Sequence, residues 1–268
     1  MPEIILPFLK WAGGKRWLTN NTEFEVPRFS GRYIEPFLGS GSIFFWLQPN
    51  DAMLSDLNSE LIATYVALRD EHAKVLRHLR QHARSHSKAH YYKARDEFRP
   101  RSTAARAARF LYLNRTCWNG LYRVNLEGKF NVPKGTKSNV ILGTDDFKAV
   151  SKILQKAKLV CCDFETVIDE AKSGDLIYAD PPYTVRHNMN GFIKYNEVLF
   201  SWEDQQRLRA ALLRASARGA KFLLSNADHA SVRELYADVG SIKVVNRASI
   251  ISGDRAARGT TTELLVSN

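Results

Sequence analysis

The sequence has few cysteines and no long hydrophobic run. Only three of its 268 residues are cysteine, and two of these, Cys161 and Cys162, are adjacent. Adjacent cysteines are poorly placed to bridge each other and the number is odd, so we expect reduced, buried thiols and no disulfide framework. No apolar stretch approaches the roughly 18 residues that a membrane span needs, and residues 1–10 lack the pattern of a signal peptide. These absences predict a cytoplasmic globular protein.

Acidic residues are scarcer than basic ones, and the imbalance is local. The chain has 39 Lys and Arg against 28 Asp and Glu, a formal charge of +11. Residues 57–145 hold 17 of the basic and 7 of the acidic residues, a net charge of +10. They also hold five of the seven histidines, whose protonation would increase the positive charge at mildly acid pH. Such a concentration of positive charge favours a polyanionic partner.

Short apolar runs that end in a polar residue recur along the chain. They are typical of buried parallel strands with functional residues at their carboxyl ends. Five runs have this pattern: Arg32–Glu35, Ala52–Asp56, Leu159–Asp163, Asp175–Asp180 and Lys221–Asn226. Two further β-rich segments, Ile242–Ile251 and Thr262–Val266, predict a closing hairpin at the edge of the sheet.

The region between the second and third of these runs has a helical pattern. Its apolar residues recur at helical spacing, and Ala104–Leu113 is rich in strong helix formers. We therefore predict an α/β protein of two parts. One is a catalytic domain of residues 1–56 and 146–268, and the other is an inserted helical domain of residues 57–145.

A glycine-containing turn follows the first predicted strand. Within Pro36–Ser42, Gly39 and Gly41 would let the backbone turn sharply and approach a ligand, although an ordinary strand-to-helix turn has the same pattern. Asp56 ends the next predicted strand, near the roughly 20-residue offset of an acid that binds ribose hydroxyls. It could also cap a helix. Together the two features favour an adenosine-containing ligand.

The segment Asp180–Tyr183 follows the most apolar of the predicted strands. The amino group of adenine is a poor nucleophile because its lone pair is delocalised into the ring. The Asp180 carboxylate and the Pro181 carbonyl could bind its two hydrogens and localise that pair, with proline rigidity, including that of Pro182, fixing the direction. Tyr183 could then stack on a base outside its helix. A Pro-Pro turn is the alternative, but its place after a buried strand favours catalysis.

Two further motifs fit cofactor and DNA binding. In Phe8–Lys15, Trp11 and Lys15 would lie against the cofactor, unless the segment is a surface turn with a core tryptophan. Leu113–Arg123 and Phe130–Pro133 combine aromatic and apolar side chains with Asn and Arg, as a protein that enters a base stack requires. A core aromatic followed by a glycine turn would give the same pattern. The surrounding positive charge favours DNA.

The combination resembles the Dam family of adenine-N6 DNA methyltransferases, the D12 class. Four blocks match in the family's order: Lys10–Lys15, Glu35–Ser42, Phe110–Pro133 and Asp180–Tyr183. The likeness continues at Leu224–Asn226 and Glu263–Leu265, so it covers nearly the whole chain. It implies a Rossmann-like class I methyltransferase fold with a seven-stranded mixed sheet and an inserted helical DNA-recognition domain. It also implies S-adenosylmethionine as methyl donor, duplex DNA as partner, no metal, and a monomer that acts on nucleoid DNA.

The resemblance implies roles for individual residues as well. The cofactor contacts would be Trp11, Lys15, Phe37, Gly39, Gly41, Asp56, Asp163, Phe164 and Asp180. The DNA contacts would be Lys10, Arg115, Trp118, Asn119, Leu121, Arg123, Asn131 and Pro133. Trp118 and Asn119 would fill the gap left by the flipped adenine, and GATC is the family's usual site. Trp118 stands where the best-known members have tyrosine, and residues 134–138 lack the aromatic side chain that those members place there.

Other functions fit parts of the pattern. The same Asp-Pro-Pro-Tyr chemistry serves an N4-cytosine or RNA amino-methyltransferase, and a catalytically silent DNA-binding protein could keep the fold. A nicotinamide dehydrogenase fits less well because the glycine turn lacks a third glycine. A cytosine-C5 enzyme would need a cysteine nucleophile, usually after proline, and no cysteine here follows a proline. We predict an enzyme that methylates N6 of a flipped adenine by direct transfer.

Overall fold

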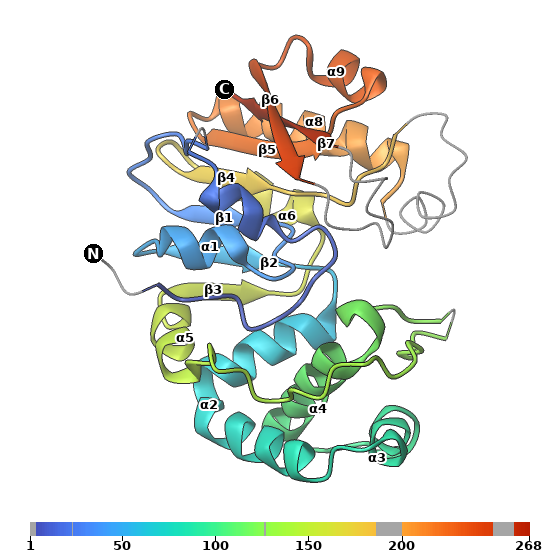
Figure 1. The fold of residues 1–268 in the computed structure, drawn as a ribbon. Coiled ribbons are helices and arrows are strands. Elements are labelled where there is room, and N and C mark those ends of the chain that lie inside the picture. The colour runs from blue at the N-terminus through green and yellow to red at the C-terminus, as the bar shows by residue number, and fades with distance from the viewer. Residues whose placement is uncertain (1–3, 23, 126, 186–199, 249–259) are drawn as a thin grey trace. The chain divides into compact units, whose positions relative to one another are not determined.

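The computed structural model describes residues 4–22, 24–125, 127–185, 200–248 and 260–268 (Figure 1). The chain divides into two compact units, and each unit draws on several stretches of sequence. The first unit comprises Met1–Lys15, Gly39–Gln48 and Asn58–Cys161, and the second comprises Arg16–Leu38, Pro49–Leu57 and Cys162–Asn268. Nearly all of the basic region 57–145 therefore belongs to the first unit.

Seven strands form one mixed sheet in the order β3-β2-β1-β4-β5-β7-β6. Their bounds are β1 Tyr33–Glu35, β2 Ala52–Ser55, β3 Ala157–Val160, β4 Leu176–Ala179, β5 Lys221–Ala227, β6 Ser241–Ala248 and β7 Thr260–Ser267. β1 pairs in parallel with β2 and β4, and β4 with β5, whereas β7 is antiparallel to both β5 and β6. The predicted α/β class, seven-stranded mixed sheet and antiparallel closing strands are confirmed. β3 lies two to three residues earlier than the predicted run Leu159–Asp163.

The strands of the second unit are apolar because both faces of the sheet are buried. Every residue of β1, β2 and β4 is buried, which is the pattern of a parallel sheet covered by helices. The helices of this unit include α6 (Phe164–Asp169), α8 (Trp202–Ala217) and α9 (Ala230–Tyr236). α8 begins with a capping box in which Ser201 and Asp204 bond each other's backbone N–H groups. The buried core of this unit joins side chains from α6 and α8 to those of the strands.

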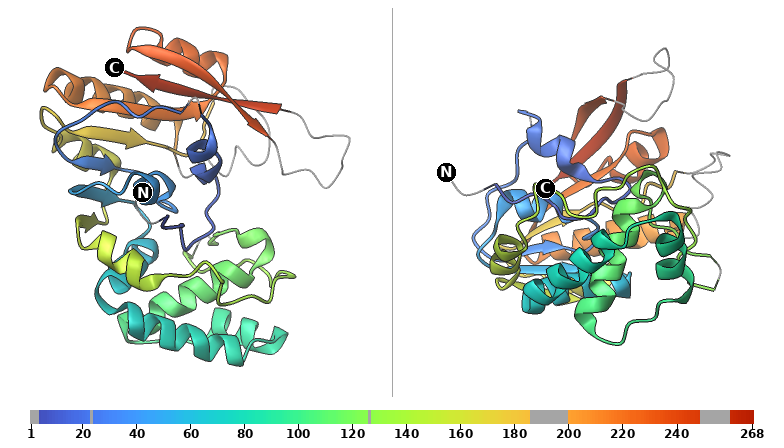
Figure 2. Two further views of the ribbon diagram at one scale, coloured as in Figure 1. Left: turned by 60° about the vertical axis from the view of Figure 1, so that its left-hand side comes forward. Right: turned by 60° about the horizontal axis from the view of Figure 1, so that its bottom comes forward.

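The first unit is mainly helical. Its elements are α1 Ser42–Leu47, α2 Ser59–Arg84, α3 Lys88–Tyr92, the π-helical η2 Lys93–Glu97, α4 Thr103–Thr116, the 3-10 turn η3 Trp118–Gly120 and α5 Phe147–Leu154. A 3-10 helix, η1, covers Lys15–Asn20, and all of it except Lys15 belongs to the second unit. α2 and α4 pack along each other, as both views in Figure 2 show. α4 contains the predicted helix Ala104–Leu113 and is longer at both ends.

The cap of α2 removes one alternative for Asp56. The side chain of Asn58 accepts the N–H of Leu61 at 3.0 Å, so Asn58 is the N-cap of that helix. Asp56, two residues earlier, is therefore not the capping residue.

The expectation that the cysteines are buried thiols needs correction. The three cysteines are free thiols, but only Cys117 is buried, whereas Cys161 is exposed and Cys162 is half-buried. The expectation of buried thiols is thus right for one residue of the three. Among the helices of the described residues, none is long and apolar enough to cross a bilayer.

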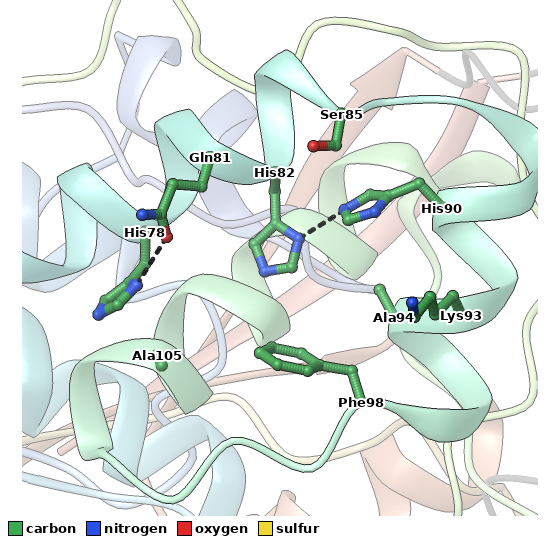
Figure 3. A pocket seen from close by; sticks show the side chains of 9 residues that line it. All are labelled: His78, Gln81, His82, Ser85, His90, Lys93, Ala94, Phe98 and Ala105. Carbon is green, nitrogen blue, oxygen red and sulfur yellow. Dashed lines mark hydrogen bonds between the residues drawn. The ribbon is translucent and has the colours of Figure 1, made fainter.

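Histidines of the basic region line a pocket in the first unit. The pocket has a volume of about 350 Å³, and its lining includes His78, His82, His90 and Phe98 (Figure 3). Nδ1 of His82 lies 2.9 Å from Nε2 of His90, and the His82 ring stacks on Tyr112 with centroids 4.7 Å apart. His82 is thus fixed between two aromatic neighbours in a largely buried position.

Burial lowers the pKa of three histidines of the basic region: His82, His86 and His90. It lowers the pKa of His82 to about 4, and the nearby charges of His90, Arg109 and His78 lower it further. Burial also lowers the pKa values of His86 and His90. The prediction that the histidines add positive charge at mildly acid pH is therefore wrong for His82, and burial opposes protonation at His86 and His90 as well.

The depressed pKa of His82 predicts a loss of stability in acid. An unfolded histidine has a pKa near 6.5, so between about pH 6.5 and pH 4 the unfolded chain binds a proton that the folded chain does not. The stability that neutral His82 contributes to the folded state is fully present above pH 6.5, and it falls as the pH drops toward 4. We expect His82 to account for about 1–2 kcal/mol of lost stability between pH 7.5 and pH 5.

Urea unfolding of wild type, His82→Phe and the pocket-rim control His78→Phe at the two pH values checks this. The Phe ring retains the stack on Tyr112 but cannot be protonated, so His82→Phe should lose less stability in acid than wild type. An identical loss in wild type and His82→Phe would contradict the assignment.

Candidate functional site

Four parallel strands of the second unit end at the same edge of the sheet. β1 ends at Glu35, β2 at Ser55, β4 at Ala179 and β5 at Ala227. Parallel pairing of β1 with β2 and β4, and of β4 with β5, aligns their carboxyl ends. Ligands of open α/β sheets bind at this edge. The predicted Asp56 and Asp180 directly follow β2 and β4 there.

The Asp180 carboxylate is held by the neighbouring strand. Its Oδ1 accepts a hydrogen bond of 2.7 Å from the Ser225 hydroxyl on β5. Ser225 is fully buried, and its Oγ lies 3.3 Å from the hydroxyl of Tyr178 on β4. Burial, reinforced by the charge of Asp180, raises the pKa of Tyr178 well above its usual value, so it remains a neutral phenol. Sequence reasoning gave Ser225 no role, although the matching block Leu224–Asn226 contains it.

Tyr183, three residues after Asp180, is also held by a side chain on another strand. Pro181 is buried and Pro182 is half-buried. The hydroxyl of Tyr183 donates a 2.6 Å hydrogen bond to Oε2 of Glu263, a buried residue on β7. Oε1 of Glu263 pairs with the Arg247 guanidinium at 3.0 Å. The hydroxyl bond therefore fixes the orientation of the tyrosine ring.

The environment of Tyr183 keeps its hydroxyl protonated. Burial raises the pKa of Tyr183 well above the usual value, and the negative charges of Asp180 and Glu263 raise it further. The hydroxyl can thus serve as a donor to Glu263. Glu263 lay in a matching sequence block but had no predicted role, because 80 residues separate it from its partner.

Other buried polar groups fasten the same edge. Glu35 is 2% exposed, and its Oε2 accepts the hydroxyl proton of Tyr33 at 2.9 Å. Asn226 is fully buried and donates through Nδ2 to Oε1 of Gln205 at 3.0 Å. Buried polar groups need such partners, so these bonds hold the ends of β1 and β5 in place.

Two predicted cofactor residues form an aromatic pair. The rings of Phe37 and Phe164 stack with centroids 5.3 Å apart, and Phe200 meets both rings at 5.5 and 5.6 Å. Aromatic walls of this kind suit a planar, largely apolar ligand group. The structure thus brings together two residues that lie far apart in the sequence.

Asp163, beside Phe164, has a structural role that the sequence did not indicate. Its Oδ1 caps α6 by accepting the N–H of Glu165 at 2.9 Å, and it also accepts from Arg207 at 2.9 Å. The guanidinium of Arg207 lies over the Phe164 ring, 4.9 Å from its centroid. A cofactor contact by Asp163 remains a prediction.

The first unit places other predicted cofactor residues close to one another. Gly39 has a φ of 47°, and a Cβ at this position would lie 2.7 Å from Cδ1 of Trp11. The Trp11 ring stacks on Tyr122 at 5.3 Å. Gly41, with a φ of 64°, precedes α1, and the buried Lys15 donates to a backbone carbonyl two residues earlier at 2.9 Å. Gly39 is therefore required both by the turn and by the packing of Trp11.

The predicted wedge residues lie at the surface of the first unit. Trp118 is 53% exposed, and Asn119 is exposed with a left-handed φ of 55°. The N–H of Trp118 donates to the carbonyl of exposed Pro133 at 2.9 Å. An antiparallel bridge between Cys117 and Lys134 closes the loop that carries them. The geometry leaves the indole available to a partner.

The other predicted DNA-binding residues of this loop are exposed or half-buried. Arg123 is exposed, and its Nε donates to Oδ1 of half-buried Asn131 at 2.9 Å. A bridge between Val124 and Phe130 joins the two sides of the loop. Leu121 is half-buried. The structure therefore gathers Arg123 and Asn131 directly, a contact that their separation in sequence does not reveal.

Arg115 does not lie at this surface. It is 3% exposed, and both terminal nitrogens of its guanidinium bond the carboxylate of Asp145, at 2.6 and 2.7 Å. The same nitrogens donate to the carbonyls of Val140 and Phe8 at 2.8 and 2.9 Å. A guanidinium held in this way ties three chain segments together and is not available to a phosphate. The prediction of Arg115 as a DNA contact is corrected accordingly.

Within the described part of the chain, no cluster of three or more His, Cys, Asp or Glu side chains is placed to hold a metal ion.

Comparison with known proteins gives the family of this chain. The family model of the D12 class N6 adenine-specific DNA methyltransferases matches residues 11–250. The chain is 36% identical to the type II methyltransferase M1.LlaDCHI of Lactococcus lactis, over 98% of this chain and 95% of the relative. It is 34% identical to the type II methyltransferase M.MjaIII of Methanocaldococcus jannaschii, over 98% and 99%. It is 32% identical to a DNA adenine methylase of Vibrio cholerae, over 96% and 94%.

These matches confirm the predicted family and the fold class. They also imply S-adenosylmethionine as methyl donor and DNA as substrate, since both define the activity of such enzymes. The chain belongs to the D12 class of N6 adenine-specific DNA methyltransferases.

Proposed function

We propose that this protein transfers a methyl group from S-adenosylmethionine to N6 of an adenine flipped out of duplex DNA, within the sequence GATC. The observation that carries the proposal is the Asp180 carboxylate, fixed by Ser225 and followed by Pro181 and Tyr183. The bound cofactor supplies the methyl group, carried on a positively charged sulfur that makes it open to attack.

The residues of this segment act on the amino group. One carboxylate oxygen of Asp180 accepts one N6 hydrogen, and the Pro181 carbonyl accepts the other. These bonds localise the nitrogen lone pair, so that N6 can attack the methyl carbon in line; the N–C bond forms as the C–S bond breaks, and the electron pair of that bond stays on the sulfur. A proton leaves N6 afterwards to solvent. No covalent bond between the enzyme and DNA is required.

Tyr183 provides the surface on which the base lies. The hydrogen bond to Glu263 sets the plane of its ring, so the ring is oriented before the base arrives. Stacking on an aromatic side chain offsets part of the cost of removing a base from the helix.

The described residues fit an adenosine-containing cofactor. Phe37 and Phe164 present stacked rings, and half-buried Asp56 follows β2, where a carboxylate can accept ribose hydroxyls. We also assign cofactor contacts to a further set of residues by resemblance to the family: Trp11, Lys15, Gly39, Gly41, Asp163 and Asp180.

Residues 57–145 are proposed as the DNA-recognition domain, and residues 1–56 with 146–268 as the catalytic domain. Trp118 and Asn119 are proposed to enter the base stack, since both are exposed on one loop. The site-reading residues would be Lys10, Leu121, Arg123, Asn131 and Pro133. The family resemblance further supports a monomer that works on nucleoid DNA in the cytoplasm.

The first test is methylation of DNA that lacks adenine methylation. The purified protein and S-adenosylmethionine should yield N6-methyladenine, identified by mass analysis of the nucleosides and mapped by single-molecule sequencing. The mark should be confined to GATC. N4-methylcytosine would overturn the base assignment, and N6-methyladenine in another motif would overturn only the site.

The hydrogen bond from Ser225 to Asp180 predicts that substitutions of these two residues lower kcat to different extents. Asp180→Asn should lower kcat by at least about 100-fold, because the amide is a poorer acceptor for N6. Ser225→Ala should lower kcat by about 10-fold, because a charge-assisted bond worth about 1.5–3 kcal/mol no longer positions the carboxylate. Single-turnover rates with bound DNA measure both, and Ser173→Ala in an exposed turn is the control. Wild-type turnover in Asp180→Asn would refute the catalytic assignment.

The Tyr183–Glu263 hydrogen bond predicts that loss of the tyrosine hydroxyl and loss of the whole ring lower the methylation rate to different extents. Tyr183→Phe keeps the ring and loses only the orienting bond, so its single-turnover rate should fall by less than about 10-fold. Tyr183→Ala also removes the stacking surface, and an additional loss of about 10–100-fold is expected. Equal rates in the two variants would show that the ring does not support the base.

A further inference from the structure

Two buried side-chain amides of the second unit form one line of hydrogen bonds. Oδ1 of Asn226, on β5, accepts the N–H of Ala227 at 2.8 Å. Nδ2 of Asn226 donates to Oε1 of Gln205, on α8, at 3.0 Å. Nε2 of Gln205 in turn donates to the carbonyl of Thr184 at 3.4 Å. The two amides therefore link the end of β5 to the residue that follows Tyr183.

The backbone fixes the direction of this line at both ends. The Ala227 N–H can only donate, and the Thr184 carbonyl can only accept. Each amide has one acceptor oxygen and one donor nitrogen, so only one orientation of Asn226 and of Gln205 satisfies every contact. Both side chains are fully buried, and turning either amide would place two donors or two acceptors against each other away from solvent. Each amide is therefore held in a single orientation.

The Thr184 hydroxyl extends the connection to an aromatic ring. Thr184 is 1% exposed, and its Oγ1 donates to the carbonyl of Phe200 at 2.6 Å. The centroid of the Phe200 ring lies 5.5 Å from that of Phe37 and 5.6 Å from that of Phe164. The position of Phe200 thus limits the space in which the other two rings stack.

The same line of bonds reaches the catalytic segment. Thr184 directly follows Tyr183, and Asn226 directly follows Ser225, whose hydroxyl bonds the Asp180 carboxylate at 2.7 Å. Successive side chains of a strand point to opposite faces, so the serine faces the carboxylate while the asparagine faces α8. The amide that α8 supplies therefore connects both segments that carry the proposed catalytic groups.

We propose that Gln205 is a positioning residue for methyl transfer. Its amide, together with the Thr184 hydroxyl, holds the chain after Tyr183 and the ring of Phe200 in one arrangement, which aligns the flipped base with the cofactor. This rests on the proposed function, in which the other two rings lie against the cofactor. A misplacement of about 1 Å between two reactants can lower the rate of an in-line transfer by about 100-fold. Gln205 acts through its neighbours and takes no part in the chemistry.

The first variant tests the connection to the cofactor side. Thr184→Val keeps the size of the side chain and removes the hydroxyl that holds Phe200. Its Kd for S-adenosylmethionine, measured by calorimetry without DNA, should rise by about 5–30-fold because the stacked rings are no longer held in place. Its single-turnover rate at saturating cofactor should stay within about 3-fold of wild type. Thr184→Ser keeps the hydroxyl and should bind the cofactor like wild type.

The second variant tests the amide itself. Gln205→Met keeps the length of the side chain and removes the bonds to Asn226 and Thr184. Its single-turnover rate with saturating cofactor and DNA should fall by about 10–100-fold, and its Kd for S-adenosylmethionine should rise as in Thr184→Val. The double variant should bind the cofactor no more weakly than Gln205→Met, because both residues act through the same contact. Gln206→Met, an exposed neighbour on α8, is the matched control and should behave like wild type.

Other outcomes overturn the proposal in distinguishable ways. An unchanged Kd and an unchanged transfer rate in folded Gln205→Met would show that the amide only satisfies buried polar groups. Losses that multiply in the double variant would show that the two residues act independently. Urea unfolding reports on the fold of each variant, and if Gln205→Met does not fold, equal Kd values for Thr184→Val and Thr184→Ser would overturn the proposal. Absence of adenine methylation by wild type would instead refute the proposed function, whatever the variants do to cofactor binding.

Discussion

The parallel pairing of β1 with β2 and β4, and of β4 with β5, is the constraint on which the candidate site depends. These strands are buried, so their backbone groups must be satisfied within the ladder, and that requirement sets the register. Ala179 is opposite Leu224, which places the next residues, Asp180 and Ser225, side by side. The 2.7 Å bond between them follows from this register. A slip of one residue would turn the serine to the other face.

The antiparallel extension of the sheet serves the same edge. β7 pairs with β5 and carries Glu263, which takes the hydroxyl bond of Tyr183. β7, which supplies no predicted catalytic residue, thereby orients Tyr183, which is one of the predicted catalytic residues. The buried acids and phenols of this edge remain mutually satisfied because burial and neighbouring negative charge keep the tyrosines protonated. Preorganisation of this kind is what a transfer reaction between two bound partners requires.

The packing of the first unit depends on glycines that leave room for larger side chains. The charge at its surface depends on which charged groups are buried. Gly39 leaves room for Trp11, and Gly120 leaves room for the stem of Lys10. The net charge of the basic region overstates the charge available to DNA, because Arg115 is paired with Asp145 inside the unit. Burial lowers the pKa of His82 in the same region to about 4, so this side chain is neutral near pH 7. The exposed residues of the loop that follows α4, and not the total charge, define the proposed DNA surface.

The sequence by itself determined the class of fold and the family, because apolar periodicity and short motifs such as Asp180–Tyr183 are local properties of the chain, whereas the order of the strands in the sheet came from the structure. The sequence also singled out Trp118, which the structure shows to be exposed. Tertiary structure alone decided that Arg115 is internal and that Glu263 orients Tyr183. It likewise decided that Ser225 holds Asp180, and that Asn114 holds the backbone of Lys10. The reason is physical: these partners are tens of residues apart, and burial, which sets both pairing and pKa, is a property of the packed chain.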